Sequence, residues 1–136
     1  MTYEQYVVRG FDGDIEFRGR LLGYATSRLN VHKSHDGHDT APAGTRCSAC
    51  RWIEIRIFKK KTGEYVLELT GQTRVSGEKT RHRVEVTASP HWVIEVLTQR
   101  PDGRDPFIPR VAKHALSEAA ASDPEMESAY VARVVA

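Results

Sequence analysis

The stretch from Arg51 to Thr87, RWIEIRIFKKKTGEYVLELTGQTRVSGEKTRHRVEVT, decides the fold of this chain. Apolar and polar side chains alternate along three runs within it, and an alternation of period two is typical of β-strands. Turn signals at Lys60–Gly63 and Ser76–Lys79 separate the runs, so the stretch predicts an antiparallel meander of three strands. The side chains expected to face the core are Ile53, Ile55, Ile57, Leu67 and Leu69.

The residues before this stretch predict a β-hairpin followed by a long polar loop. Asp12-Gly13 separates two strand-like runs within residues 1–25, and an Asp-Gly pair between such runs is typical of a hairpin turn. Residues 26–46 contain few apolar side chains and show no periodicity. A loop of this length is uncommon inside a compact domain, so we expect it to be either functional or disordered.

The residues after the meander predict helices. Ser89-Pro90 places a serine at the N-cap and a proline at the first helical position, and Asp123-Pro124 repeats this arrangement within the helical residues 105–136. Residues 47–100 thus form a βββα core. We predict a single α+β domain spanning residues 1–136, an antiparallel β-meander of about five strands with helices C-terminal to it.

Composition excludes several classes of protein. The chain has 136 residues, 40% of them hydrophobic and 28% charged, which is ordinary for one soluble globular domain. The N-terminal residues do not have the pattern of a signal peptide, and no apolar run is long enough to cross a membrane. The two cysteines are too close in sequence to indicate a secreted disulfide scaffold. We therefore expect a cytoplasmic protein with no membrane partner.

One cluster of residues has the donor types of a zinc site. The candidate ligands are His32, His35, His38, Cys47 and Cys50, which lie within 19 residues. Imidazole and thiolate are preferred zinc donors, and a structural site needs four of them. Against zinc, no glycine follows Cys50 and a strand begins directly after it. The prediction for cofactors is therefore none or one structural zinc, the alternative being a solvated loop that ends in two ordinary thiols.

Basic residues gather in two runs, Lys59–Lys61 and residues 74–83. Residues 51–100 hold ten basic and six acidic side chains, which makes them the most basic part of the chain. Successive turns of a meander lie at opposite ends of the sheet, so we expect the two runs not to merge into one patch. The candidate binding residues are Arg74, Lys79, Arg81 and Arg83. The alternative is a solvated sheet face with cross-strand charge pairs.

Three segments resemble parts of small uncharacterised proteins of actinobacteria and their phages. They are Arg46–Glu54 (RCSACRWIE), Gly63–Val66 and Ser89–Glu95, and the resemblance spans about residues 45–98. It implies an actinobacterial or phage setting and a small accessory protein rather than a metabolic enzyme. It implies no function for any individual residue.

Three functions stay open at this point. We favour a non-enzymatic accessory protein that binds another macromolecule, and a protein partner before any other. The first alternative is a nucleic-acid-binding regulator that uses the basic middle third of the chain. The second is a small enzyme whose site no motif reveals, and no catalytic residue is assigned. Because function concentrates on loops held by rigid elements, we expect the working surface on loop 26–50 and the sheet edge.

Overall fold

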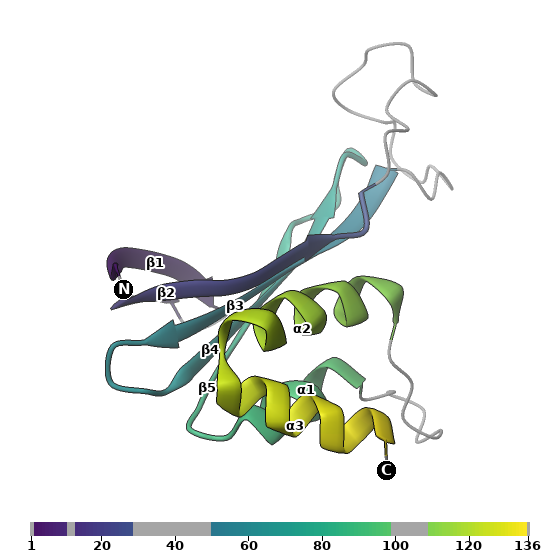
Figure 1. Cartoon of the computed structure of the whole chain (residues 1–136). Helices are drawn as coiled ribbons and strands as arrows, with labels where there is room; N and C mark the ends of the chain where they lie inside the picture. Colours follow the sequence, from purple (N-terminus) through teal and green to yellow (C-terminus); the bar gives the residue numbers. More distant parts are fainter. Residues whose placement is uncertain (1, 11–12, 29–49, 99–108, 136) are drawn as a thin grey trace.

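Alternation and turns in the sequence produce one antiparallel sheet followed by helices in the computed structural model (Figure 1). The structure describes residues 2–10, 13–28, 50–98 and 109–135. The five described strands lie in sequence order, and every neighbouring pair is antiparallel. The elements are β1 (Glu4–Gly10), β2 (Gly13–Thr26), β3 (Arg51–Lys60), β4 (Tyr65–Thr73), β5 (Arg81–Thr87), α1 (Pro90–Thr98), α2 (Arg110–Ser122) and α3 (Pro124–Val135). The predicted α+β meander with C-terminal helices is confirmed.

Two of the turns between strands depend on glycine. Gly63 lies between β3 and β4 with a φ angle of 101°, and Gly77 lies between β4 and β5 with a φ angle of 87°. Side chains with a Cβ rarely adopt such positive angles, whereas glycine does so without strain. The turns close opposite ends of β4, so the basic runs Lys59–Lys61 and residues 74–83 lie at opposite ends of the sheet, as predicted.

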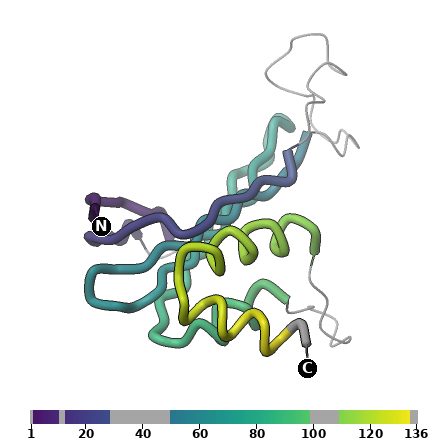
Figure 2. Tube along the Cα trace, in the orientation of Figure 1, coloured from purple at the N-terminus to yellow at the C-terminus, as the bar shows by residue number. Residues whose placement is uncertain are grey.

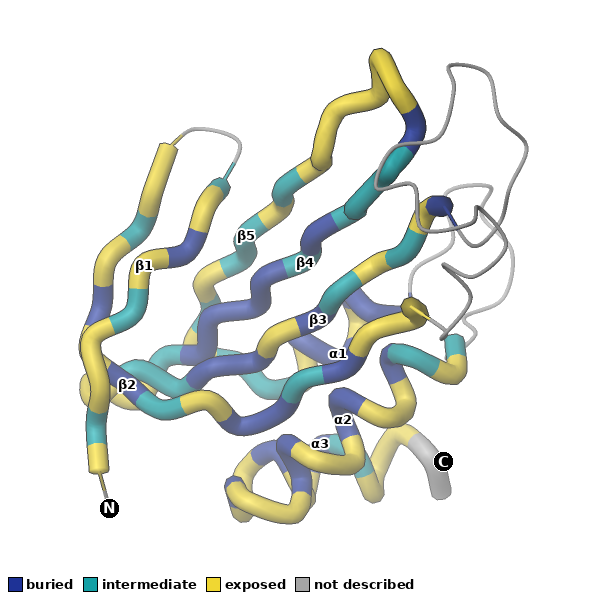
Figure 3. Tube along the Cα trace, turned by 90° about the horizontal axis from the view of Figure 1, so that it is seen from above, coloured by how far each residue is buried: buried dark blue, intermediate teal, exposed yellow. Residues whose placement is uncertain are grey.

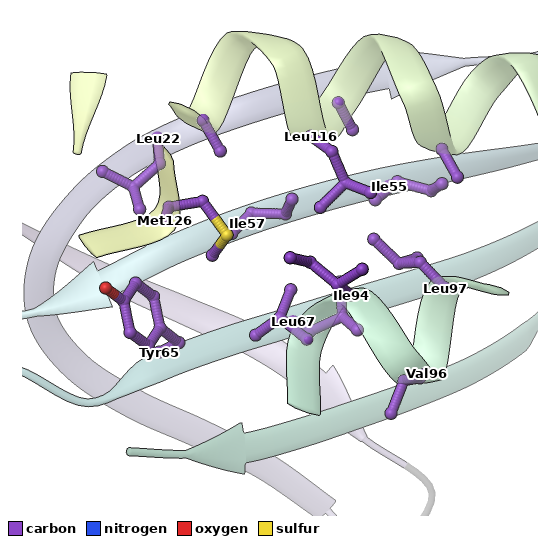
Figure 4. Packing of buried hydrophobic residues seen from close by; sticks show 14 of the residues in the cluster. Leu22, Ile55, Ile57, Tyr65, Leu67, Ile94, Val96, Leu97, Leu116 and Met126 are labelled. Atoms are coloured by element: carbon purple, nitrogen blue, oxygen red, sulfur yellow. The ribbon is translucent and has the colours of Figure 1, made fainter. Parts of the chain in front are cut away.

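The helices cover one face of the sheet and bury the main core there (Figure 4). Ile55, Ile57 and Leu67 are buried on this face, as the alternation predicted. The helices contribute further buried side chains, among them Val93, Ile94, Leu97, Ala115, Leu116, Ala119 and Met126. Gly23 of β2 permits a close approach of α2, because a Cβ at this position would collide with the backbone of Ala115 and Ala119.

Ile53 departs from the predicted core. It lies on the expected face, yet 42% of its surface is exposed. Its cross-strand neighbour on β4 is Gly71, which has no side chain to cover it, and a short residue, Ser27, follows the other neighbouring strand. The prediction that Ile53 packs in the core is therefore wrong, and Leu69 is only partly buried.

The opposite face of the sheet carries a second, smaller apolar cluster. The sheet curls so that β1 comes close to β5 (Figure 3). This curl buries Val8, Phe17, Phe58 and Val66, and the ring centroids of Phe17 and Phe58 lie 5.3 Å apart in an edge-to-face arrangement. Both faces of β4 are thus buried along part of its length, because helices cover one face and the curled hairpin covers the other.

The helix starts follow the predicted caps. Ser89 Oγ accepts a hydrogen bond from the Trp92 amide at 3.3 Å, and Asp123 Oδ2 accepts one from the Met126 amide at 3.1 Å. Most of the predicted loop 26–46 and of the linker before α2 lies outside the described residues. In the part of the chain that is described, the helices are too short and too polar to span a bilayer.

Candidate binding groove

The strands β3, β4 and β5 extend beyond the ends of the helices (Figure 2). A groove lies on this part of the sheet. Its volume is about 620 Å³. The described residues that line it are Ser27, Arg51, Trp52, Ile53, Gly71, Gln72, Thr73, Glu78, Lys79 and Arg81. The uncovered face around Ile53 and the turn between β4 and β5 together form this groove.

The floor of the groove is apolar. Exposed Ile53 lies opposite Gly71, and a second hollow of about 240 Å³ continues from this pair along β4 and β5. Leu69 and Arg83 line the second hollow, while Ile53, Gly71 and Arg81 line both. Gly71 has no side chain to fill the space beside Ile53, and both hollows adjoin this pair.

A charged pair holds one wall of the groove in place. The Arg51 guanidinium donates to both carboxylate oxygens of Glu78, at 2.8 Å and 2.6 Å, and this bidentate geometry is the strongest form of an ion pair. Thr73 Oγ1 donates to the same carboxylate at 2.8 Å. These hydrogen bonds, from Arg51 first and Thr73 second, lower the pKa of Glu78. The turn between β4 and β5 is thereby tied to the start of β3.

Two cations of the groove have no such partner. Lys79 and Arg81 make no ion pair with any carboxylate among the described residues, whereas Arg83 pairs with Glu85 at 2.8 Å. Arg74 lies at the end of β4, where its amide donates to the carbonyl of Cys50 at 2.8 Å. The structure thus brings Lys79, Arg81 and Arg83 together around the hollows and places Arg74 at the adjoining turn.

Sequence reasoning selected only Lys79 and Arg81 among the ten described residues that line the groove, and three of those it missed matter most. Arg51 and Glu78 were not selected, and Ile53 was assigned to the core. The signal for the ion pair lay in the turn at Gly77, since a tight turn there places Glu78 close to the start of β3. The exposure of Ile53 could have been suspected from Gly71, because a glycine inside a strand leaves its neighbours uncovered.

Trp52 lies beside the groove with its ring already in contact with a cation. The Arg28 guanidinium carbon lies 4.5 Å from the centroid of the Trp52 ring, and the indole nitrogen donates to Glu54 at 3.3 Å. These contacts fix the ring on the rim and occupy one of its faces. The groove therefore offers an apolar floor and two cations, Lys79 and Arg81, that make no ion pair among the described residues. Both features can bind a partner.

Only one of the five predicted zinc ligands lies among the described residues. Cys50 is fully buried and packs against Val75 next to the groove. His32, His35, His38 and Cys47 lie outside the described residues. Within the described ranges, no three histidine, cysteine, aspartate or glutamate side chains gather into a group that could hold a metal ion. The zinc site stays a prediction.

A buried polar cluster lies far from the groove and has a structural role. Asp123 is 2% exposed; its carboxylate accepts hydrogen bonds from Tyr65 Oη at 2.6 Å and Lys59 Nζ at 2.8 Å. Arg20 lies 3.5 Å from the same carboxylate. Because each group is satisfied by another, the cluster joins the α2–α3 turn to the sheet.

Comparison with protein-family models, curated proteins and solved structures finds no match to this chain.

Proposed function

We propose that this chain is a non-enzymatic accessory protein that acts by binding another protein, and that the groove receives an acidic segment of that partner. The proposal is set in the actinobacterial or phage context that the resemblance of residues 45–98 implies. The observation that supports it best is the position of two unpaired cations, Lys79 and Arg81, beside the exposed side chain of Ile53.

An apolar centre with a charged rim is the usual anatomy of a protein-binding surface. Apolar anchors in the centre provide most of the affinity, and charges on the rim steer and orient the partner. Ile53 is the apolar centre here, and Lys79 and Arg81 are the rim. Since the only carboxylate lining the described groove is held by Arg51, the positive charge of Lys79 and Arg81 favours a partner segment with acidic side chains.

A protein partner fits the groove better than a nucleic acid does. Proteins that bind single strands stack bases on exposed aromatic rings. Among the described residues that line the groove, Trp52 is the only aromatic one, and Arg28 covers one face of its ring. Duplex binding uses a continuous stripe of cations along the phosphates. The two basic runs are separated by the nine residues of β4, about 30 Å, and form no such stripe.

Capture from lysate of the source cells, with and without nuclease, tests this function. We expect the same protein to be retained by the wild type and by Arg9→Glu/Lys61→Glu, which makes the same charge change on exposed residues outside the groove. Lys79→Glu/Arg81→Glu should retain about tenfold less, because like charges then face the acidic segment. Ile53→Ser should also weaken retention.

Two outcomes would overturn the proposal. Retention that disappears on nuclease treatment would assign the groove to a nucleic acid and put the regulator hypothesis first. Equal retention by the wild type, the groove variants and the control variant would show that the partner binds elsewhere on the molecule.

A further inference from the structure

One edge of the sheet is left open along the second half of β2. On one side, β1 pairs with Gly13–Gly19, while on the other side β3 pairs with Gly19–Thr26. Among the described residues, no strand therefore lies against the outer side of Leu21–Thr26 (Figure 3). The Ser27 amide donates to the Ile53 carbonyl at 2.9 Å, so by alternation the backbone groups of Tyr24 and Thr26 point away from β3.

This edge has a β-bulge between Leu21 and Gly23 but lacks the charged side chains that the other edges carry. Proteins prevent edge-to-edge pairing by placing charged side chains or proline on exposed edge strands. The edge strand β5 carries Arg81, Arg83 and Glu85, and β1 carries Glu4 and Arg9. In contrast, Leu21–Thr26 reads LLGYAT, with no charge and no proline, and Leu21 is 42% exposed. An unprotected apolar edge of this kind is a template for pairing with another chain.

Helix α2 runs alongside the open edge in the opposite direction to β2 (Figure 1). Ser122 Oγ donates to the Leu22 carbonyl at 3.2 Å at one end. At the other end, Arg110 lines a groove with the Tyr24–Ser27 segment. This groove has a volume of about 700 Å³, and its described lining is Tyr24, Ala25, Thr26, Ser27, Arg110, Val111, His114 and Glu118. A chain that pairs with the edge would therefore also contact this side of α2.

The charged side chains on this side of α2 would be complementary to the same side of α2 in a second copy. Arg110 and Glu118 both line the groove and are separated by eight residues, about 12 Å along the helix, with His114 midway. Tyr24 lines the groove together with His114. A two-fold axis through this region would place Arg110 of each copy opposite Glu118 of the other, which is the arrangement of an isologous interface.

We infer from this geometry that the open edge of β2 pairs with a second copy of the chain. The two strands run antiparallel, centred on Tyr24, and join two five-stranded sheets into one continuous sheet. The two α2 helices then lie antiparallel across the axis, with Arg110–Glu118 pairs on each side. This inference uses other residues than the proposed function does: Ser27 lines both grooves, but Lys79 and Arg81 line only the first, and Arg110 and Glu118 only the second.

Sedimentation velocity at micromolar concentrations tests the dimer. We expect the wild type to sediment as a dimer, and Arg110→Glu and Glu118→Arg each to weaken it about tenfold or more, since two attractive pairs become two repulsive ones. The double variant Arg110→Glu/Glu118→Arg should restore the dimer, because each copy again meets the opposite charge. Lys61→Glu, in the turn between β3 and β4, serves as a charge-matched control and should leave the dimer unchanged.

Hydrogen exchange gives a second readout that does not depend on a substitution. The outward amides of Tyr24 and Thr26 should be protected in the dimer and become unprotected on dilution to monomer. A wild type that is monomeric at all these concentrations would overturn the inference. So would a dimer that both single reversals leave intact, or one that the charge swap fails to restore.

Discussion

At the scale of single residues, Asp123 both caps a helix and joins that helix to the sheet. It caps α3 through the Met126 amide and holds Tyr65 and Lys59 on the sheet side. Asp123→Ala would remove the cap and leave a buried hydroxyl and a cation without their acceptor. We expect a loss of about 3–5 kcal/mol in the free energy of unfolding, measured by urea denaturation. Asp123→Asn keeps a capping oxygen and should cost less; equal stability of the alanine variant and the wild type would contradict this role.

The same cluster predicts how stability depends on pH. Burial, and then the hydrogen bond to Asp123, raise the pKa of Tyr65 from its usual 10.0 to about 12. Because the folded state keeps the proton more tightly, this stabilisation is present below pH 10 and lost as the pH rises toward 12. Burial opposes the charge of Asp123, but hydrogen bonds from Lys59 and Tyr65 outweigh it and lower the pKa of Asp123. That contribution is present above the usual carboxyl pKa and lost as the pH falls through the lowered value.

Urea titrations between pH 8 and pH 11 check the alkaline part of this prediction. Tyr65→Phe should be less stable than the wild type at pH 8, because it lacks the hydrogen bond to Asp123. The difference between the two proteins should shrink above pH 10, where the phenol of the unfolded wild type ionises. A difference that stays constant over this range would mean that Tyr65 keeps an ordinary pKa in the folded state.

Two isoleucines on β3 were both predicted to pack in the core, but only one of them is buried. Ile55 is 1% exposed and Ile53 is 42% exposed, although both lie on the same face of the strand. Ile55→Ala should lower the free energy of unfolding by about 2–5 kcal/mol through the cavity that it leaves. Ile53→Ala should change it by no more than about 0.5 kcal/mol. Thermal melts in which Ile55→Ala is as stable as the wild type would show that the assigned face is wrong.

At the scale of elements, the sequence was sufficient to predict strands and helix starts, because these depend on local patterns. Apolar alternation and glycine turns predicted β3, β4 and β5, and the serine and aspartate caps predicted where α1 and α3 begin. The exposure of side chains that are covered by residues distant in sequence could not be predicted in this way. Alternation with Leu67 and Leu69 places Glu68 on the opposite, polar face of β4, yet only 7% of its surface is exposed, because the sheet curls on that side. The candidate cations Lys79 and Arg81 were found from the turn, whereas their apolar neighbour Ile53 needed the register with Gly71.

The zinc hypothesis concerns the segment that contains His32, His35, His38 and Cys47, together with Cys50. It predicts one equivalent of zinc per chain in protein purified without a histidine tag, and loss of that zinc in Cys47→Ser, because a structural site needs four donors. Elemental analysis of both proteins decides the question. A content well below one equivalent in the wild type, unchanged by the substitution, would contradict the hypothesis.

At the scale of the whole molecule, the covered faces, the open edge and the groove lie on different parts of the sheet. The helices and the curled hairpin stabilise its two faces, the open edge of β2 lies beside α2, and the groove lies at the far ends of β3, β4 and β5. Because the groove extends past the helices, a partner can occupy it without disturbing the main core. A variant of the groove should therefore lose binding and keep its stability.

Chemical-shift mapping shows whether the groove binds an acidic segment of a protein. Once a partner has been captured, its acidic segment is added to the isotope-labelled chain at physiological salt. We predict that the largest amide shifts fall on Ile53, Gly71, Lys79 and Arg81, and that they are absent in Lys79→Glu/Arg81→Glu. Shifts confined to α1 and α3, or shifts of these four residues that only DNA or RNA produces, would contradict binding of an acidic protein segment in the groove.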